Sequence, residues 1–377
     1  MVYVIGFISL IASFIYLVWK IETYIPSLQK PAKGVSIDFK ELIEWFKLLG
    51  EKKKYNGVVA LFRGEEELFQ CCLGYRDAEQ KYRIDTHTRF RLASVSKQFT
   101  AFGMMVLLKK FQFKEKYDTL VSDILEEFPY QNVSIRHLLN HTSGIEVDYM
   151  ALAKGYRNGE KEILTIQKAL NLICSEQVVK SVSPATRFSY NNTNYVVLAG
   201  LIERISEVSF EEFMRKEVFE PLELSSTLVW NLTAKTPFAK LENVAVDFEQ
   251  YLNTKPRVVE PDWIDGVSGD GGIFSSLHDL KKWMSMIESN PLLSQEEMNE
   301  AFQKPILKNG DRTEYGFGWV IQRDMIWHDG KWLATNSFIM KNRISDMTLV
   351  MIDNSNNLRF DKILYSIKES VFKNEQE

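Results

Sequence analysis

The chain has 377 residues, 45% of them hydrophobic and 25% charged, which is typical of a globular protein with a sizeable core. Its length exceeds one average domain, so we expect either two lobes or one large domain with an anchor. A net charge of −4 without a long basic block disfavours nucleic-acid binding. Three cysteines (Cys71, Cys72 and Cys174) without a Cys-x-x-Cys spacing indicate neither a disulfide framework nor a zinc site.

An uncharged run extends from Val2 to Trp19. About 18 apolar residues suffice to cross a bilayer, and the run lacks the basic region and small-x-small site of a cleavable signal peptide. It therefore predicts a single-pass transmembrane anchor over residues 1–20, followed by a linker over 21–36 and a domain over 37–377. Lysines follow the run and none precedes it, so the positive-inside rule would place that domain in the cytoplasm.

A helix and a hairpin are predicted next. Apolar periodicity from Ile37 to Leu49 favours a helix. Strand-like runs follow at Gly57 to Phe62 and at Leu68 to Leu73, and the turn residues at 63–65 between them indicate a hairpin.

Ser94 and Lys97 stand three residues apart where an apolar run begins a predicted helix. This spacing places both side chains on the first turn, where the helix N-terminus supplies partial positive charge for an alkoxide or oxyanion. A hydroxyl beside an amine is a candidate nucleophile with its base. The spacing alone is weak, because it recurs at Ser27 and Lys30 and because a helix N-cap explains Ser94 equally well.

From residue 99 to about residue 290 the pattern is mostly helical. His137 and His141 stand four residues apart, a spacing that can bind a metal ion from one helix face. No third ligand is evident nearby, so we favour a helix that ends in the turn at 142–144 and expect no metal site.

A polar loop, Phe188 to Tyr195, leads into another predicted helix. Within it, Tyr190 can share a proton with a Ser-Lys pair, and Asn192 can hold a substrate amide or the lysine. An Asx-rich turn without a catalytic role is the alternative. The glycine-rich segment 266–273 predicts a tight turn behind the site, and the aperiodic stretch 231–264 predicts a long loop that borders a pocket.

Four strand-like runs and a final amphipathic helix complete the pattern. The runs cover 316–322, 325–328, 337–340 and 347–352, and the helix covers about 360–372. His328, followed by Asp329 and Gly330, ends the second run and is a candidate proton donor at the edge of a site. A surface histidine at a turn is the alternative.

The ordered set of motifs resembles that of the serine beta-lactamase-like hydrolases. The motifs are Ser94-x-x-Lys97, Tyr190-x-Asn192 and His328-Asp-Gly330, in the contexts 135–144, 269–272 and 315–319. This family includes class C beta-lactamases, D-Ala-D-Ala carboxypeptidases and related esterases. The resemblance covers roughly Ile37 to Phe372 and implies an α/β (α+β) fold. In that fold an antiparallel sheet from both chain ends (37–93 and 300–377) is flanked by helices, and a mostly helical lobe (94–299) is inserted.

The resemblance also implies a mechanism. Ser94 would attack a carbonyl and form an acyl-enzyme, while Lys97 and Tyr190 share the role of base. His328 would help to protonate the leaving group. No cofactor or metal is implied, and the expected partner is a small ester, amide or peptide substrate.

Three further residues, Asn192, Gly330 and Lys331, would bind the substrate. Asn192 would orient both the substrate and Lys97. The backbone N–H groups of Ser94 and of Lys331, the residue after Gly330, would form the oxyanion hole.

Two departures from the family pattern bear on the substrate. A histidine, His328, stands where lactamases carry lysine, and Asp329 stands where threonine or serine commonly helps to hold a substrate carboxylate. An anion there disfavours a penicillin or a D-Ala terminus, so we predict an esterase or small-peptide or amide hydrolase rather than a true beta-lactamase.

Two alternatives remain open. The chain could be a non-catalytic, penicillin-binding-like module that binds cell-wall peptide or a protein, although the intact Ser94, Lys97 and Tyr190 favour an enzyme. The resemblance implies an extracytoplasmic domain, against the lysine bias around the apolar run, and we expect the extracytoplasmic position.

Overall fold

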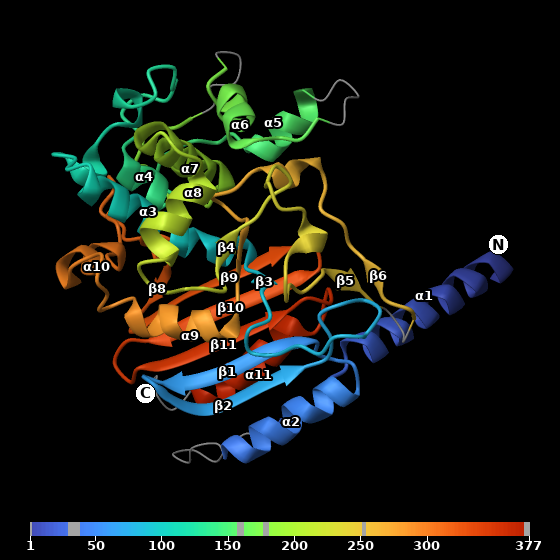
Figure 1. Cartoon of the computed structure of the whole chain (residues 1–377). Coiled ribbons are helices and arrows are strands. Elements are labelled where there is room, and N and C mark those ends of the chain that lie inside the picture. The colour runs from blue at the N-terminus through green and yellow to red at the C-terminus, as the bar shows by residue number, and fades with distance from the viewer. Residues whose placement is uncertain (1, 29–37, 157–161, 176–180, 251–253, 373–377) are drawn as a thin grey trace.

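The computed structural model describes residues 2–28, 38–156, 162–175, 181–250 and 254–372. A six-stranded antiparallel sheet in the order β2-β1-β11-β10-β9-β8 forms its centre (Figure 1). The strands are β1 Gly57–Arg63, β2 Glu66–Leu73, β8 Val320–Gln322, β9 Met325–Trp332, β10 Thr335–Asn342 and β11 Met347–Asp353. β1 pairs with β11, with Gly57 opposite Asp353, so the predicted sheet from both chain ends is present.

Helices cover both faces of this sheet. α2 (Phe39–Glu51) and α11 (Phe360–Val371) pack on one face, where Phe46, Leu349 and Ile363 share a core. The opposite face packs against α9 (Leu277–Met286) and the helical lobe through residues such as Val350. Because β11 is covered on both sides, all seven of its residues are buried, as expected for a central strand.

The inserted lobe is mostly helical (Figure 1). Its helices are α3 Ser96–Lys110, α4 Ile135–Leu139, α5 Tyr149–Tyr156, α6 Ile166–Ile173, α7 Asn192–Ser206, α8 Phe210–Met214 and α10 Gln295–Ala301, with short turns η1 Ala93–Val95, η2 Lys116–Asp118, η3 Val121–Asp123, η5 Arg215–Phe219, η6 Phe238–Lys240 and η7 Trp263–Gly266. A small sheet joins β3 (Phe90–Arg91), β7 (Ile273–Ser275) and β4 (Leu228–Val229), and β5 (Phe248–Glu249) pairs with β6 (Arg257–Val258). α3 is the central helix, since every residue from Ser96 to Leu108 is buried.

Two predicted strand boundaries differ from the structure. β9 continues to Trp332, so His328, Asp329 and Gly330 lie inside a strand and not at its end. β8 begins only at Val320, because the preceding residues form a turn against α3. In that turn Gly318 has φ +81°, and a Cβ there would lie only 2.7 Å from a backbone oxygen of α3.

The predicted transmembrane anchor is wrong: within the described residues, no helix combines the length and the apolar character that a bilayer crossing requires. α1 (Val2–Thr23) continues beyond the apolar run into charged residues that are joined to the sheet lobe. Glu22 forms an ion pair with Arg359 at 2.5 Å, and Lys54 Nζ donates to the backbone oxygen of Ile21 at 3.1 Å.

The connection after α1 is also attached to the sheet lobe. Ile25 is buried, and Trp45 Nε1 donates to the backbone oxygen of Pro26 at 2.9 Å. The rest of the predicted linker, residues 29–36, and the first residue of the predicted helix at Ile37 lie outside the described residues. The boundary of the domain and its extracytoplasmic position stay predictions.

Replacing Leu349 by alanine should lower the free energy of unfolding by about 2–5 kcal/mol, because the side chain is fully buried in the central strand. Denaturant-induced unfolding measures this change. Ile344→Ala is the matched control, since Ile344 is 79% exposed and its truncation should change stability by less than about 0.5 kcal/mol. Equal effects of the two substitutions would contradict the placement of this core.

Candidate active site

The turn that carries Ser94 is a single turn of 3₁₀-helix, η1, between β3 and α3. Ala93 has φ +49°, a left-handed conformation that costs a non-glycine residue about 1–2 kcal/mol. Such strain is concentrated at functional sites. No side chain caps α3, whose N-cap position is Val95, so the alternative of Ser94 as a helix cap does not apply.

Lys97 lies under Ser94 and is completely buried. Its Nζ donates to Ser94 Oγ at 3.1 Å and to the backbone oxygen of Asp270 at 2.8 Å. The ring of Tyr190 lies over the same nitrogen, with 5.0 Å between Nζ and the ring centroid. The structure therefore brings a hydroxyl, an amine and a phenol together at one point.

β9 approaches the Ser94 turn through Gly330. A Cβ at this position would lie 2.4 Å from the backbone oxygen of Leu92, 2.5 Å from Ser337 Oγ and 2.9 Å from the backbone nitrogen of Ser94. Ser337 Oγ donates to the same Leu92 oxygen at 2.6 Å. Only glycine fits here, because any side chain would push β9 away from the Ser94 turn.

The register of β9 sets the direction of the Lys331 N–H. The two-residue turn after Trp332 is closed by the pair Trp332–Thr335, and hydrogen-bonded pairs alternate along an antiparallel ladder. The peptide groups of Lys331 therefore point away from β10. On that side β8 pairs only with Met325 to Trp327, and the Ser94 turn contacts the remainder of β9.

The loop before α7 separates the roles of two neighbouring asparagines. Asn191 is the N-cap: its side chain accepts from Thr193 N–H at 2.9 Å and donates to the backbone oxygens of Ile145 and Val147, each at 3.0 Å. Asn192 is thereby left facing the cleft beside Ser94. Its Oδ1 is buried and accepts no hydrogen bond from the described residues.

His328 is buried beside this group, and both of its ring nitrogens have partners. Nδ1 lies 2.5 Å from the backbone oxygen of Asp329 and must donate to it, so Nε2 accepts from Tyr315 Oη at 2.9 Å. Burial, together with the charge of Lys97, lowers the pKa of His328 to about 3. The imidazole is therefore neutral, and the proton-donor role stays a prediction that requires Nε2 to exchange Tyr315 for a leaving group.

The sequence singles out His141 only for its spacing from His137, yet the structure gives it contacts to the residues of the site. Its Nδ1 accepts from the backbone N–H of Asn191 at 3.2 Å, and its ring centroid lies 4.4 Å from that of Tyr190. Burial and the nearby Lys97 hold its pKa well below the usual value, so the ring is neutral. His137 instead caps α4 through Ser134. Across the described residues no cluster of three or more potential ligands could hold a metal ion.

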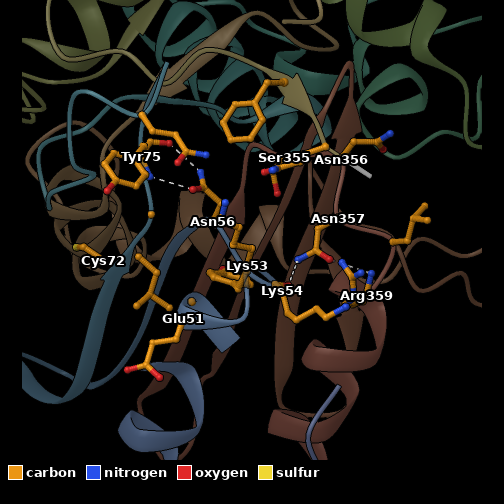
Figure 2. A pocket seen from close by; sticks show the side chains of 18 of the residues that line it. Glu51, Lys53, Lys54, Asn56, Cys72, Tyr75, Ser355, Asn356, Asn357 and Arg359 are labelled. Atoms are coloured by element: carbon orange, nitrogen blue, oxygen red, sulfur yellow. Dashed lines mark hydrogen bonds between the residues drawn. The ribbon is translucent and has the colours of Figure 1, made fainter. Parts of the chain in front are cut away.

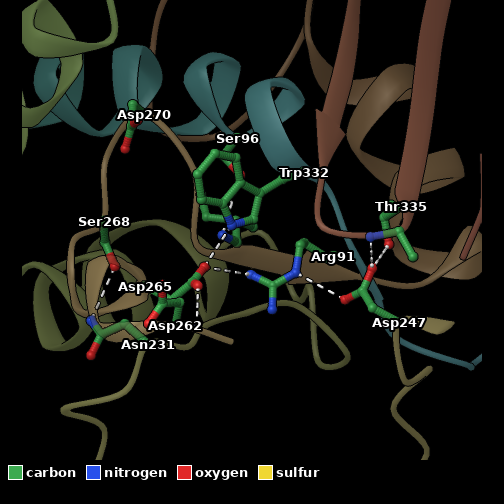
Figure 3. A network of polar contacts seen from close by, with 12 residues as sticks. Arg91, Ser96, Asn231, Asp247, Asp262, Asp265, Ser268, Asp270, Trp332 and Thr335 are labelled. Atoms are coloured by element: carbon green, nitrogen blue, oxygen red, sulfur yellow. Dashed lines mark hydrogen bonds and ion pairs between the residues drawn. The ribbon is translucent and has the colours of Figure 1, made fainter. Parts of the chain in front are cut away.

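The cleft beside Ser94 includes residues that the sequence did not single out. They come from α5, the end of β4, the segment before β7 and β9: Tyr149, Trp230, Asp265, Asp270 and Trp332. Figure 3 shows how Arg91 joins two carboxylates below this cleft: Nε lies 3.1 Å from Asp247, and Nη1 lies 3.8 Å from Asp265. Asp247 also accepts from Thr335 Oγ1 at 2.6 Å. This network ties the loops at the cleft to β3 and β10.

A second cavity, of about 380 Å³, lies near α1, α2 and the end of β11 (Figure 2). It contains none of the predicted site residues. Burial raises the pKa of Cys72, which lines it, to about 11, so this side chain is a thiol at neutral pH and not a nucleophile. The smaller cleft at Ser94 is therefore the candidate active site.

Comparisons with known proteins agree with this geometry. A family model described as Beta-lactamase matches residues 42–369. Penicillin-binding protein 4* of Bacillus subtilis (strain 168) is 30% identical over 328 residues, which cover 84% of this chain and 71% of that protein. A D-aminopeptidase of Brucella canis is 26% identical over 268 residues, covering 70% of this chain but only 48% of the relative, so the chain spans about half of that protein.

The fold is similar to the crystal structure of a penicillin binding protein from Bacillus halodurans. The TM-score is 0.72 at 23% identity, and the match covers 85% of this chain and 98% of the other.

Gly330→Ala should lower kcat by about 100-fold or more, because displacing β9 removes the Lys331 N–H from the Ser94 turn. Steady-state kinetics on an activated ester measures the loss. Gly155→Ala is the matched control, since among the described residues no atom outside the glycine's own helix lies within 4 Å of the added Cβ. Full activity of Gly330→Ala would exclude this edge of β9 as part of the site.

His328 should make the free energy of unfolding depend on pH. The folded state leaves its imidazole neutral down to pH about 3, whereas the unfolded chain binds a proton below about pH 6.5, so unfolding takes up a proton between these values. Stability is therefore lost as pH falls through this window, by at most about 1.4 kcal/mol per pH unit for one group. We expect His328→Gln to have a flatter pH dependence of the unfolding free energy than the unmodified chain.

Denaturant titrations at about pH 6, 5 and 4 test this expectation. His87→Gln, at an exposed histidine, is the matched control. If the free energy of unfolding changed equally steeply with pH in His328→Gln and in the unmodified chain, His328 would not be the group that causes the loss of stability in acid.

Proposed function

We propose that Ser94 forms an acyl-enzyme with small amides, peptides or esters. The chain belongs to the beta-lactamase family of serine hydrolases. The observation that carries the proposal is the hydrogen bond of 3.1 Å from a buried lysine, Lys97, to Ser94 Oγ. A binding module has no need for a hydroxyl, an amine and a phenol at one point, whereas nucleophilic catalysis does.

The chemistry follows from these positions. Ser94 Oγ attacks the substrate carbonyl, and its proton passes to the base formed by Lys97 and Tyr190. The N–H groups of Ser94 and Lys331 hold the developing oxyanion. The proton then goes to the leaving group, which departs and leaves an ester on Ser94. A water molecule attacks this ester and gives up its proton to the same base. The base returns a proton to Ser94 Oγ as the bond to the acyl carbon breaks, and the acid is released.

The substrate preference is inferred from β9. Asp329 is exposed beside Gly330 and carries its negative charge on the same strand as the Lys331 N–H. A carboxylate on the substrate, as in a penicillin or a D-Ala terminus, would meet this charge. Esters and amides without such a carboxylate avoid it, and the name of the D-aminopeptidase relative favours amide substrates.

Ser94→Ala should lower turnover of an activated acyl ester by several orders of magnitude, because it removes the attacking oxygen. A fluorophosphonate probe followed by mass spectrometry should find the adduct on Ser94 in the unmodified chain and no adduct in the variant. Ser27→Ala, at the exposed serine of the second Ser-x-x-Lys spacing in the sequence, is the matched control and should label normally.

A panel of short acyl esters, small amides, D-Ala-D-Ala peptides and penicillins then ranks the substrates. We expect turnover of esters and amides to exceed that of penicillins. No adduct on Ser94 in the unmodified chain would overturn the enzymatic proposal in favour of a non-catalytic peptide- or protein-binding module. Penicillin turnover above that of all esters would overturn the substrate preference alone.

A further inference from the structure

A carboxylate that the proposed mechanism does not use lies in the cleft. The backbone oxygen of Asp270 and Ser94 Oγ both contact Lys97 Nζ, at 2.8 Å and 3.1 Å, so no more than 5.9 Å separates them. The Asp270 side chain lines the same cleft as Ser94. Asp270 is thus an acidic residue of the cleft whose backbone lies close to Ser94.

The other carboxylate of the cleft, Asp265, already has partners for both of its oxygens. Its Oδ1 accepts from Trp332 Nε1 at 2.6 Å and lies 3.8 Å from Arg91 Nη1, and its Oδ2 accepts from the backbone N–H of Asp262 at 2.7 Å. Figure 3 shows this carboxylate inside the Arg91 network and Asp270 apart from it. Asp265 is therefore committed to holding the loop and is not available for a ligand.

Asp270 has a different environment. Its Oδ2 accepts from Tyr149 Oη at 3.1 Å, and within the described part of the chain it makes no ion pair. Burial and the charge of Asp270 hold the pKa of Tyr149 well above its usual value, so the phenol stays protonated and keeps donating. Burial also raises the pKa of Asp270, against the effect of Lys97. A carboxylate in such a place gains from a cation supplied by a ligand.

A second acceptor points to the same kind of ligand. Asn192 lines the cleft, and its buried Oδ1 lacks a donor among the described residues. Two acceptors, one of them charged, match a group that carries several N–H donors and a positive charge. A protonated amine has both properties.

We propose that Asp270, held by Tyr149 and assisted by Asn192, binds the protonated amino group of the substrate. The preferred substrates are then amides, esters and peptides whose acyl part is an amino acid with a free α-amine, which is one carbon away from the carbonyl that Ser94 attacks. This inference rests on the proposed acyl-enzyme on Ser94. The small volume of the cleft, about 70 Å³, favours a compact acyl group.

The test compares two substrates that differ only in this amine: alanine p-nitroanilide, as both enantiomers, and propionyl p-nitroanilide. We expect the unmodified chain to have at least tenfold higher kcat/KM for one alanine enantiomer than for the propionyl compound at pH 7. The preference should fall as pH rises through about 8, where the α-amine loses its proton. This pH effect needs no variant and so does not depend on a variant folding.

Asp270→Asn should reduce kcat/KM for the alanine substrate at least tenfold more than for the propionyl substrate. Asp148→Asn is the matched control: Asp148 is exposed outside the cleft lining, caps α5 through the N–H of Met150, and asparagine retains that cap. This control removes a nearby charge and should leave the substrate ratio unchanged.

Three outcomes overturn the inference. The first is no preference for either alanine substrate over the propionyl compound, and the second is a preference that does not change with pH. The third is an equal loss of kcat/KM on both substrates in Asp270→Asn, which would mean that Asp270 acts only by positioning Lys97. In each of them, hydrolysis of the propionyl compound by the unmodified chain would leave the acyl-enzyme proposal standing. Hydrolysis of neither compound, together with no probe adduct on Ser94, would instead refute the proposed function itself.

Discussion

The close approach of β9 to the turn that carries Ser94 is the constraint on which the rest of the site depends. At Gly330 there is no room for a Cβ, because the Leu92 oxygen and the Ser94 nitrogen would lie 2.4 Å and 2.9 Å from it. This contact joins the sheet lobe to the first turn of the helical lobe. The cleft lies where the two lobes meet. Its geometry depends on Gly330, whose lack of a side chain lets β9 approach the Ser94 turn.

Buried Lys97 imposes a second constraint, since an amine removed from water must find acceptors. One acceptor is the Asp270 backbone oxygen, so the loop at 269–272 has to be held in place. Thr100 Oγ1 donates to the backbone oxygen of Gly269 at 2.7 Å, and the φ of +109° at Gly269 brings the loop against α7, where a Cβ would lie 2.5 Å from the oxygen of Tyr195. α3 and α7 together therefore fix the backbone oxygen that accepts from the Lys97 amine.

Local patterns predicted the secondary structure well and the tertiary contacts only in part. Local hydrophobic patterns predicted β1, β2, β11 and the last helix. β1 and β11 are apolar runs that are buried on both faces, and the last helix has one apolar face. The spacing of Ser94 and Lys97 correctly predicted that their side chains are neighbours, because residues three positions apart on a helix lie close together in any environment. The position of His328 inside β9 was missed, since Asp329 and Gly330 have turn-like composition and only pairing with β10 keeps them extended.

The chemistry of Asp270 and Tyr149 could not be read from the sequence. Their contact joins residues that are 121 positions apart in the chain. Hydropathy alone was likewise insufficient for α1, because it does not report the charged contacts that Glu22 makes with the sheet lobe.

The construction of the sheet from both chain ends also governs when the site can exist during synthesis. The hydrogen bond from Ser337 to Leu92 joins residues 245 positions apart, and β1 finds its neighbour β11 only in the last part of the chain. Until β11 leaves the ribosome, β1 has an unpaired edge of apolar residues, which is a template for association with other chains. Long-range pairing of this kind also slows folding. The nascent chain therefore carries Ser94 and Lys97 long before β9 can reach their turn, and during that interval it exposes an apolar strand edge.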